Sequence, residues 1–88
     1  MNYAIKLHND ALRYLQKQDK VTRNRILDHF DILAENPKHP ELDIKKMQGV
    51  NDRYRLRVGS FRIVYSIHDN ELIVIIIKIG SRGDVYKS

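Results

Sequence analysis

Cysteine is absent from this chain of 88 residues, so disulfides and thiolate metal sites are excluded. Long hydrophobic runs are absent too, because the longest, residues 72–77, is far too short to span a bilayer. No apolar stretch like the core of a signal peptide follows Met1. We therefore expect a cytoplasmic protein with no membrane partner.

Residues for several common kinds of catalysis are also scarce. The four histidines include no pair with metal-ligand spacing, no group of carboxylates suggests metal-assisted hydrolysis, and no glycine-rich phosphate loop occurs. The histidines fall at predicted element ends, in loops or on the polar side of a helix, away from the basic cluster described below. A ribonuclease that works with two histidines is therefore not expected, and neither a metal nor a cofactor is predicted.

What the chain has in excess is positive charge. Sixteen lysines and arginines against eleven acidic residues give a formal net charge of +5, which favours a polyanionic partner such as a nucleic acid. A merely basic, solvated surface would give the same value, so charge alone decides little. The length predicts one domain, residues 1–88, with a modest core and a site on an open face or in a shallow groove.

Hydrophobic spacing predicts one short strand followed by two helices. Residues 3–7 alternate as a strand does, and Asn9 is expected to cap a short helix. The second helix, residues 20–35, ends before Pro37 because the residue preceding a proline avoids the helical conformation. The apolar side chains expected to face a sheet are Ala11, Leu12, Leu15, Ile26, Phe30, Leu33 and Ala34.

The second half of the chain is predicted to form strands. Residues 53–58 and 61–67 alternate, the run 72–79 is apolar on both faces and suits a central strand, and residues 45–48 are expected to be irregular or a short edge. The order β-α-α-β-β-β predicts an α+β fold, an antiparallel sheet with a two-helix hairpin on one face. If that hairpin returns the chain to the end it left, the first strand pairs antiparallel with the last.

The dipeptide Gly59-Ser60 fixes the register of one hairpin. A two-residue connection with glycine first suits a type II′ turn, and it places Arg57 directly opposite Arg62. The face expected to lie in the core under the helices holds Tyr54, Leu56, Val58, Phe61, Ile63 and Tyr65. The other face holds Arg53, Arg55, Arg57 and Arg62.

Arg57 and Arg62 thus form a cross-strand pair of like charge, which destabilises a sheet by up to roughly 1 kcal/mol. A sheet selected only for stability would avoid this pair. A phosphate between the two guanidinium groups would turn the repulsion into charge-assisted hydrogen bonds. The alternative is a solvated face with the arginines splayed into water. For the cluster as a whole we favour a bound anion, the phosphates of RNA.

The C-terminal segment adds further candidates. Gly80 and Gly83 let the backbone turn sharply, so that Arg82 can point back toward the open face. Tyr86 beside a basic patch suits stacking on an unpaired base, although closing the small core is an equally good role for this ring.

The assembled pattern resembles the RelE branch of the RelE/ParE toxin superfamily, and the element order covers almost the whole chain. The residues that carry the resemblance are Lys46-Met47-Gln48-Gly49, Tyr54-Arg55-Leu56-Arg57, Phe61-Arg62-Ile63-Val64-Tyr65, Ile79-Gly80-Ser81-Arg82 and Asp84-Val85-Tyr86. The resemblance implies a type II toxin that cuts mRNA in the ribosomal A site without a metal. In this reaction a ribose 2′-OH attacks the adjacent phosphate.

The resemblance also implies roles by position. Arg55 and Arg57 match the basic pair that activates the 2′-OH, and Arg62 matches the residue that stabilises the transition state. Arg82 matches the group that assists the leaving oxygen, and Tyr86 the ring that orients a base. Further RNA contacts are expected from Lys45, Lys46, Arg53 and Lys78.

One departure concerns the base that takes the proton. The family often has lysines where this chain has Arg55 and Arg57, and arginine effectively never loses its proton. We therefore expect electrostatic activation, or proton transfer to a ribosomal group, to Lys45 or to Lys46.

The implied partners are mRNA, the ribosome and a neutralising antitoxin whose acidic or amphipathic segment would cover the arginines or a sheet edge. Two other functions stay open. One is a ParE-like toxin that inhibits DNA gyrase without cutting RNA, and the other is a passive RNA- or ribosome-binding module.

Overall fold

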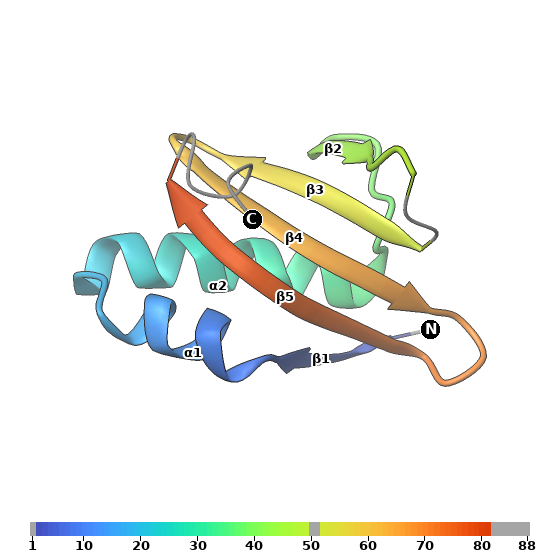
Figure 1. Cartoon of the computed structure of the whole chain (residues 1–88), viewed down its shortest axis with the longest axis horizontal. Coiled ribbons are helices and arrows are strands. Elements are labelled where there is room, and N and C mark those ends of the chain that lie inside the picture. The colour runs from blue at the N-terminus through green and yellow to red at the C-terminus, as the bar shows by residue number, and fades with distance from the viewer. Residues whose placement is uncertain (1, 50–51, 82–88) are drawn as a thin grey trace.

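The computed structural model describes residues 2–49 and 52–81 and arranges them as a sheet with two helices against one face (Figure 1). The elements are β1 (Ala4–Leu7), α1 (Asn9–Gln16), α2 (Lys20–Glu35), β2 (Asp43–Lys46), β3 (Arg53–Val58), β4 (Phe61–His68) and β5 (Ile73–Ser81). The predicted α+β class and the helix hairpin on one face are confirmed. None of the helices in these ranges is long and apolar enough to cross a membrane.

The sheet is mixed, with the order β1-β5-β4-β3-β2. Neighbouring strands from β2 to β5 are antiparallel, whereas β1 pairs with β5 in parallel. The predicted antiparallel pairing of the first strand with the last is therefore wrong. The reason is that Asp43–Lys46 forms a strand, whereas the sequence predicted only an irregular segment or a short edge at residues 45–48. This strand adds one more reversal of chain direction, which turns β5 into the direction of β1.

The hairpin of β3 and β4 has the register that its turn predicts. Val58 pairs with Phe61, and Arg57 pairs with Arg62. Of the two turn residues only Gly59 has a positive φ, at 58°, as a turn with glycine first requires. Because side chains alternate along a strand, this register separates a face of arginines from an apolar face.

Replacing Gly59 by alanine should destabilise the fold. A side chain at φ +58° costs about 1–2 kcal/mol in backbone strain, and the added Cβ would lie 3.1 Å from the Arg25 guanidinium, which is flexible enough to move. We expect the free energy of unfolding in urea to fall by about that amount. Gly49→Ala is the matched control for a glycine in open space. Gly49 also has a positive φ, at 78°, but among the described residues, its chain neighbours aside, no atom lies within 4 Å of its Cβ position. Equal losses in the two variants would assign the cost to backbone strain, and no loss at Gly59 would contradict the turn geometry.

The core lies between the helices and the apolar face of the sheet. From α2, Ile26, Phe30 and Leu33 are buried, as their spacing predicts, and they belong to the same hydrophobic cluster as Leu56 and Ile63 of the β3–β4 hairpin. Burial raises the pKa of the Tyr65 phenol, whose hydroxyl donates a hydrogen bond of 2.7 Å to the carbonyl of Pro37. The polar end of this buried ring is thus satisfied, as buried hydroxyls need to be.

Two details of the first helix differ from the prediction. His8, not Asn9, is the N-cap of α1, and it makes no side-chain capping bond. Leu12, predicted to face the sheet, is 40% exposed, while Ala11 and Leu15 are buried. A helix of eight residues has only two turns, so the two buried side chains Ala11 and Leu15 are enough to pack α1 against β5.

Candidate functional site

A row of charged side chains crosses the open face of the sheet beside the Gly59 turn. In register along this row lie Asp43 of β2, Arg57 of β3 and Arg62 of β4, with Gly80 of β5 at the end. The prediction that Arg57 and Arg62 occupy directly opposite positions on one face is confirmed. Because Gly80 has no side chain, β5 places none beside Arg62 in this row.

The anion beside Arg57 comes from the chain itself. Arg57 Nε donates to Oδ2 of Asp43 at 2.6 Å, and the two side chains remain 57% and 40% exposed. Arg62 turns back to the hairpin instead, where its Nη1 donates to the carbonyl oxygens of Gly59 and Phe61 at 3.3 and 3.2 Å. Part of the like-charge repulsion is thus offset within the chain, a contribution that the sequence analysis missed.

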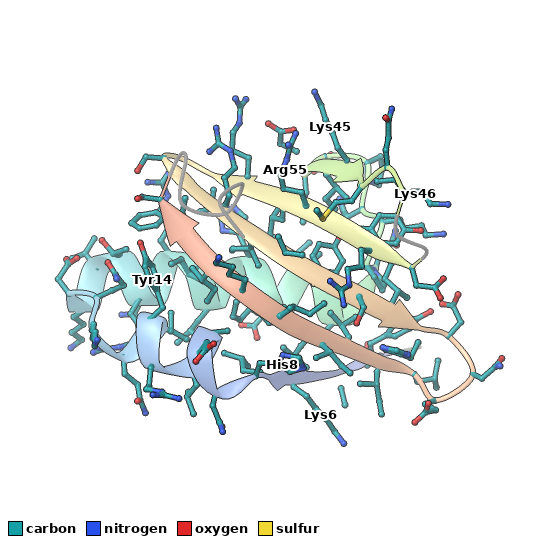
Figure 2. The ribbon with its side chains drawn as sticks, viewed as in Figure 1. Lys6, His8, Tyr14, Lys45, Lys46 and Arg55 are labelled. Atoms are coloured by element: carbon teal, nitrogen blue, oxygen red, sulfur yellow. The ribbon has the colours of Figure 1, made fainter. Side chains whose placement is uncertain are left out.

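A second basic row follows one step along the strands. Lys45 of β2, Arg55 of β3 and Lys78 of β5 lie on the same face, with the small side chain of Val64 between the last two. Figure 2 shows Lys45 and Arg55 near each other on the side of the sheet away from the helices. Three predicted site residues therefore lie in one row, Arg55 of the activating pair and the RNA contacts Lys45 and Lys78.

Lys46 and Arg53 lie at the margins of this surface. Lys46 pairs with Tyr54, so it alternates toward the helix side of β2. It nevertheless lines a shallow pocket of about 250 Å³ with Lys45 and Arg55 at this sheet edge. Arg53 pairs with Ser66 and continues the arginine face toward the far end of β3.

The chemistry available on this face is the binding and neutralisation of negative charge. Arginine presents five N–H donors in a planar fork that matches a phosphate. Among the described strands, the cations on the face are Lys6, Lys45, Arg53, Arg55, Arg57, Arg62 and Lys78, with Asp43 as the acidic member of the first row. Within residues 2–49 and 52–81 no group of three or more histidine, cysteine or acidic side chains could hold a metal ion.

Comparisons with known proteins identify the family. A profile described as "ParE toxin of type II toxin-antitoxin system, parDE" matches residues 5–86. A "Putative RelE-like toxin protein" of Escherichia coli is 34% identical over 98% of this chain and 92% of its own length. The toxin in the crystal structure of the archaeal RelE–RelB complex from Pyrococcus horikoshii is 32% identical, with a TM-score of 0.82 over 96% of this chain and 99% of that one. The chain belongs to the RelE/ParE toxin superfamily.

The relatives place this toxin in the RelE-like branch. A further relative, the "mRNA interferase toxin RelE" of Escherichia coli K12, is 26% identical over 98% of this chain and 92% of its own length. The matches therefore span nearly the full length on both sides, and the fold of the described residues is RelE-like.

Two of the predicted site residues of the toxin lie outside the described residues. These are Arg82 and Tyr86, and their roles stay predictions. The described part of β5 ends at Ser81, directly after Gly80 at the end of the Arg57–Arg62 row.

Two histidines of the toxin are closer to the arginine face than predicted. His8 and His68 both line a pocket that includes Arg53, so the expectation that no histidine lies near the arginines is wrong. His68 could have been placed by extending the alternation from Arg62 through Val64 and Ser66. His8 could not, because it reaches the face through the parallel pairing of β1 with β5.

Proposed function

We propose that this RelE-like toxin is a ribosome-dependent mRNA endonuclease that acts in the A site. The observation that carries the proposal is the Arg57–Arg62 pair, two cations held opposite each other on an open face where a phosphate can reach both. The name mRNA interferase of the 26% identical relative agrees with it. An antitoxin of its own would neutralise this chain. The similar toxin from Pyrococcus horikoshii was crystallised in a complex with RelB.

The proposed reaction is an internal transfer at one phosphate. The ribose 2′-oxygen bonds to phosphorus as the bond to the 5′-oxygen of the next nucleotide breaks. One proton leaves the 2′-OH and one is delivered to the leaving 5′-oxygen, so protons are neither gained nor lost overall. The products are a 2′,3′-cyclic phosphate and a 5′-OH. Arg62 stabilises the charge that builds on the phosphate. Its described hydrogen bonds both use Nη1, and both go to uncharged carbonyl oxygens, which bind a guanidinium less strongly than a phosphate does.

Activation of the 2′-OH is electrostatic in this proposal. Arg55 and Arg57 remain protonated at any working pH, so they lower the cost of the oxyanion without accepting its proton. Lys45 stands opposite Arg55, and its side chain is exposed. Lys45, Lys46 or a ribosomal group then receives the proton, and Arg82 and Tyr86 assist the leaving oxygen and orient a base.

A translating extract tests the proposed function directly. Purified toxin should cut mRNA on ribosomes, with cleavage ends mapped by primer extension and a 5′-OH on each downstream fragment. The same mRNA without ribosomes should stay intact, and addition of the antitoxin should stop cleavage. Uncut mRNA in the translating extract would contradict the proposal.

Inhibition of DNA gyrase is the second candidate, because the family profile carries the name of ParE toxins. This activity would leave mRNA intact and would block DNA supercoiling in a purified gyrase assay. A passive RNA- or ribosome-binding module would give neither result, although its RNA binding would weaken with salt.

Asp43→Asn should strengthen RNA binding by the toxin. The carboxylate competes with phosphate for Arg57, and its ion pair is exposed, so its loss should cost at most about 1 kcal/mol of stability. We expect tighter binding to single-stranded RNA, with a steeper decrease as salt rises, measured by fluorescence anisotropy. The control is Asp10→Asn, which removes the same charge from an exposed pair with Arg13 on α1. Equal effects of the two variants would show that only net charge matters.

A further inference from the structure

A pocket of about 330 Å³ opens on the arginine face at the end remote from the Gly59 turn. Arg53 of β3, Ser66 and His68 of β4, and Ile75 and Ile77 of β5 line it, and His8 adds a wall from the end of β1. Figure 2 shows His8 beside β5, across the sheet from Lys45 and Arg55. The predicted active residues around Arg57 and Arg62 do not contribute to this pocket.

The lining is held in place by specific contacts. Ser66 is 7% exposed, and its hydroxyl lies 3.0 Å from Nε2 of His68, so the imidazole ring has a fixed neighbour on its own strand. A β-bulge between Val64 and Tyr65 leaves Ile77 without a register partner on β4. Bulges commonly redirect a side chain next to a functional site, and here the unpaired Ile77 lines the pocket.

A strained residue borders the same pocket. Asp52 has φ +63°, a conformation that aspartate adopts at some cost, and its carbonyl accepts a hydrogen bond of 3.1 Å from the Ile67 amide. Asp52 is one of the lining residues, which also include one arginine, two histidines, one serine and two isoleucines.

This mixture suits a nucleobase better than a free phosphate. A base has two flat apolar faces that rings and aliphatic groups can cover, and a polar edge for a carboxylate or hydroxyl. A phosphate would gain from Arg53 but would be repelled by Asp52. The pocket volume of about 330 Å³ lies at the lower end of the range for small-molecule pockets. A pocket of this size suits a ligand as small as a single nucleoside.

The arginines of β3 provide the path to this pocket. Arg57, Arg55 and Arg53 alternate along one strand, so their Cα atoms are spaced by about 6.6 Å, twice the rise of ~3.3 Å per residue. This spacing is similar to that between successive phosphates of an extended single strand. An RNA whose phosphates follow these arginines from the Arg57–Arg62 pair is thus led to the pocket.

We propose that the pocket of His8, Ser66, His68, Ile75 and Ile77 receives one unpaired RNA base, outside the nucleotides that flank the cut. The inference rests on the proposed function, because the base belongs to RNA held on the arginine face. Messenger RNA and ribosomal RNA can both supply such a base on the ribosome, and the test distinguishes them.

The test uses ribosomes programmed with a synthetic mRNA in which a single abasic residue is moved from position to position around the A-site codon. We measure the toxin concentration for half-maximal cleavage and the rate at saturation. For a messenger base, removal at one position outside the cut should raise the half-maximal concentration on the order of tenfold with the saturating rate unchanged. His68→Ala should cause a similar rise on intact mRNA and should no longer sense that abasic position.

Matched variants separate the pocket from general effects. His8→Ala probes the pocket from a different strand, whereas His29→Ala makes the same change on α2 and should behave as the unaltered toxin. If His68→Ala raises the half-maximal concentration but no abasic position matters, ultraviolet cross-links from residues 66–77 should map to ribosomal RNA. Cross-links to neither RNA would overturn the proposal.

The possible failures are distinguishable. Absence of cleavage of intact mRNA would overturn the proposed function itself. Normal cleavage with unchanged half-maximal concentrations in both His8→Ala and His68→Ala would overturn the pocket alone.

Discussion

Arg62→Ala should lower the rate of mRNA cleavage by a factor of about 10²–10³, which corresponds to about 2.7–4 kcal/mol of lost transition-state stabilisation. The effect is large because Arg62 stands directly opposite Arg57, where the charge of the attacked phosphate would develop. The fold should survive, since the described hydrogen bonds of Arg62 go only to carbonyl oxygens at its own turn. Removing it also relieves the like-charge pair with Arg57.

The measurement is single-turnover cleavage of mRNA on programmed ribosomes, together with the urea midpoint of the free toxin. Arg62→Lys keeps the charge but loses the planar fork of donors, so its cleavage rate should lie between those of the unaltered toxin and Arg62→Ala. Arg13→Ala removes the same charge from an exposed position on α1 and should cut at the normal rate. A cleavage rate of Arg62→Ala within twofold of the unaltered toxin would remove Arg62 from the mechanism.

The β3–β4 hairpin that carries the arginines could be predicted from sequence because every signal for it is local. Gly59 supplies the one positive φ that the turn needs, and side-chain alternation then assigns each neighbouring residue to a face. The spacing of Ile26, Phe30 and Leu33 likewise fixes the buried face of α2 from within one helix.

The direction of β1 relative to β5 could not be predicted in the same way. It depends on whether Asp43–Lys46 forms a strand, and a segment of four residues with one apolar side chain, Ile44, has no decisive local signal. Pairing with β3 makes it a strand, and the same pairing brings Asp43 to Arg57. One long-range contact therefore sets both the direction of the last strand and the ion pair in the candidate site.

The pocket with two histidines has the same origin. His68 follows from the register of β4, but His8 is 60 positions away in the sequence and reaches Ile77 only because β1 lies beside β5. Sites assembled across such a pairing combine residues whose sequence contexts are unrelated. The local sequence around either histidine therefore gives no sign that the two line one pocket.

The largest loss of stability is expected from Ile63→Ala, at about 2–5 kcal/mol. Ile63 is fully buried in the middle of β4, where it pairs with Leu56 on one side and Ile79 on the other. Truncation leaves a cavity under the strand that carries Arg62. A small domain has only about 5–15 kcal/mol of stability, so much of it would be lost.

Urea unfolding followed by circular dichroism measures this loss. Val21→Ala removes a similar apolar group from a site that is 76% exposed on α2, and its stability should change by at most about 0.5 kcal/mol. Because Ile63 faces the helices, the cleavage rate per folded molecule should change far less than in Arg62→Ala. A loss below about 1 kcal/mol for Ile63→Ala would mean that the helices do not pack on this face, and the arginines would then no longer be assigned to the open side of the sheet.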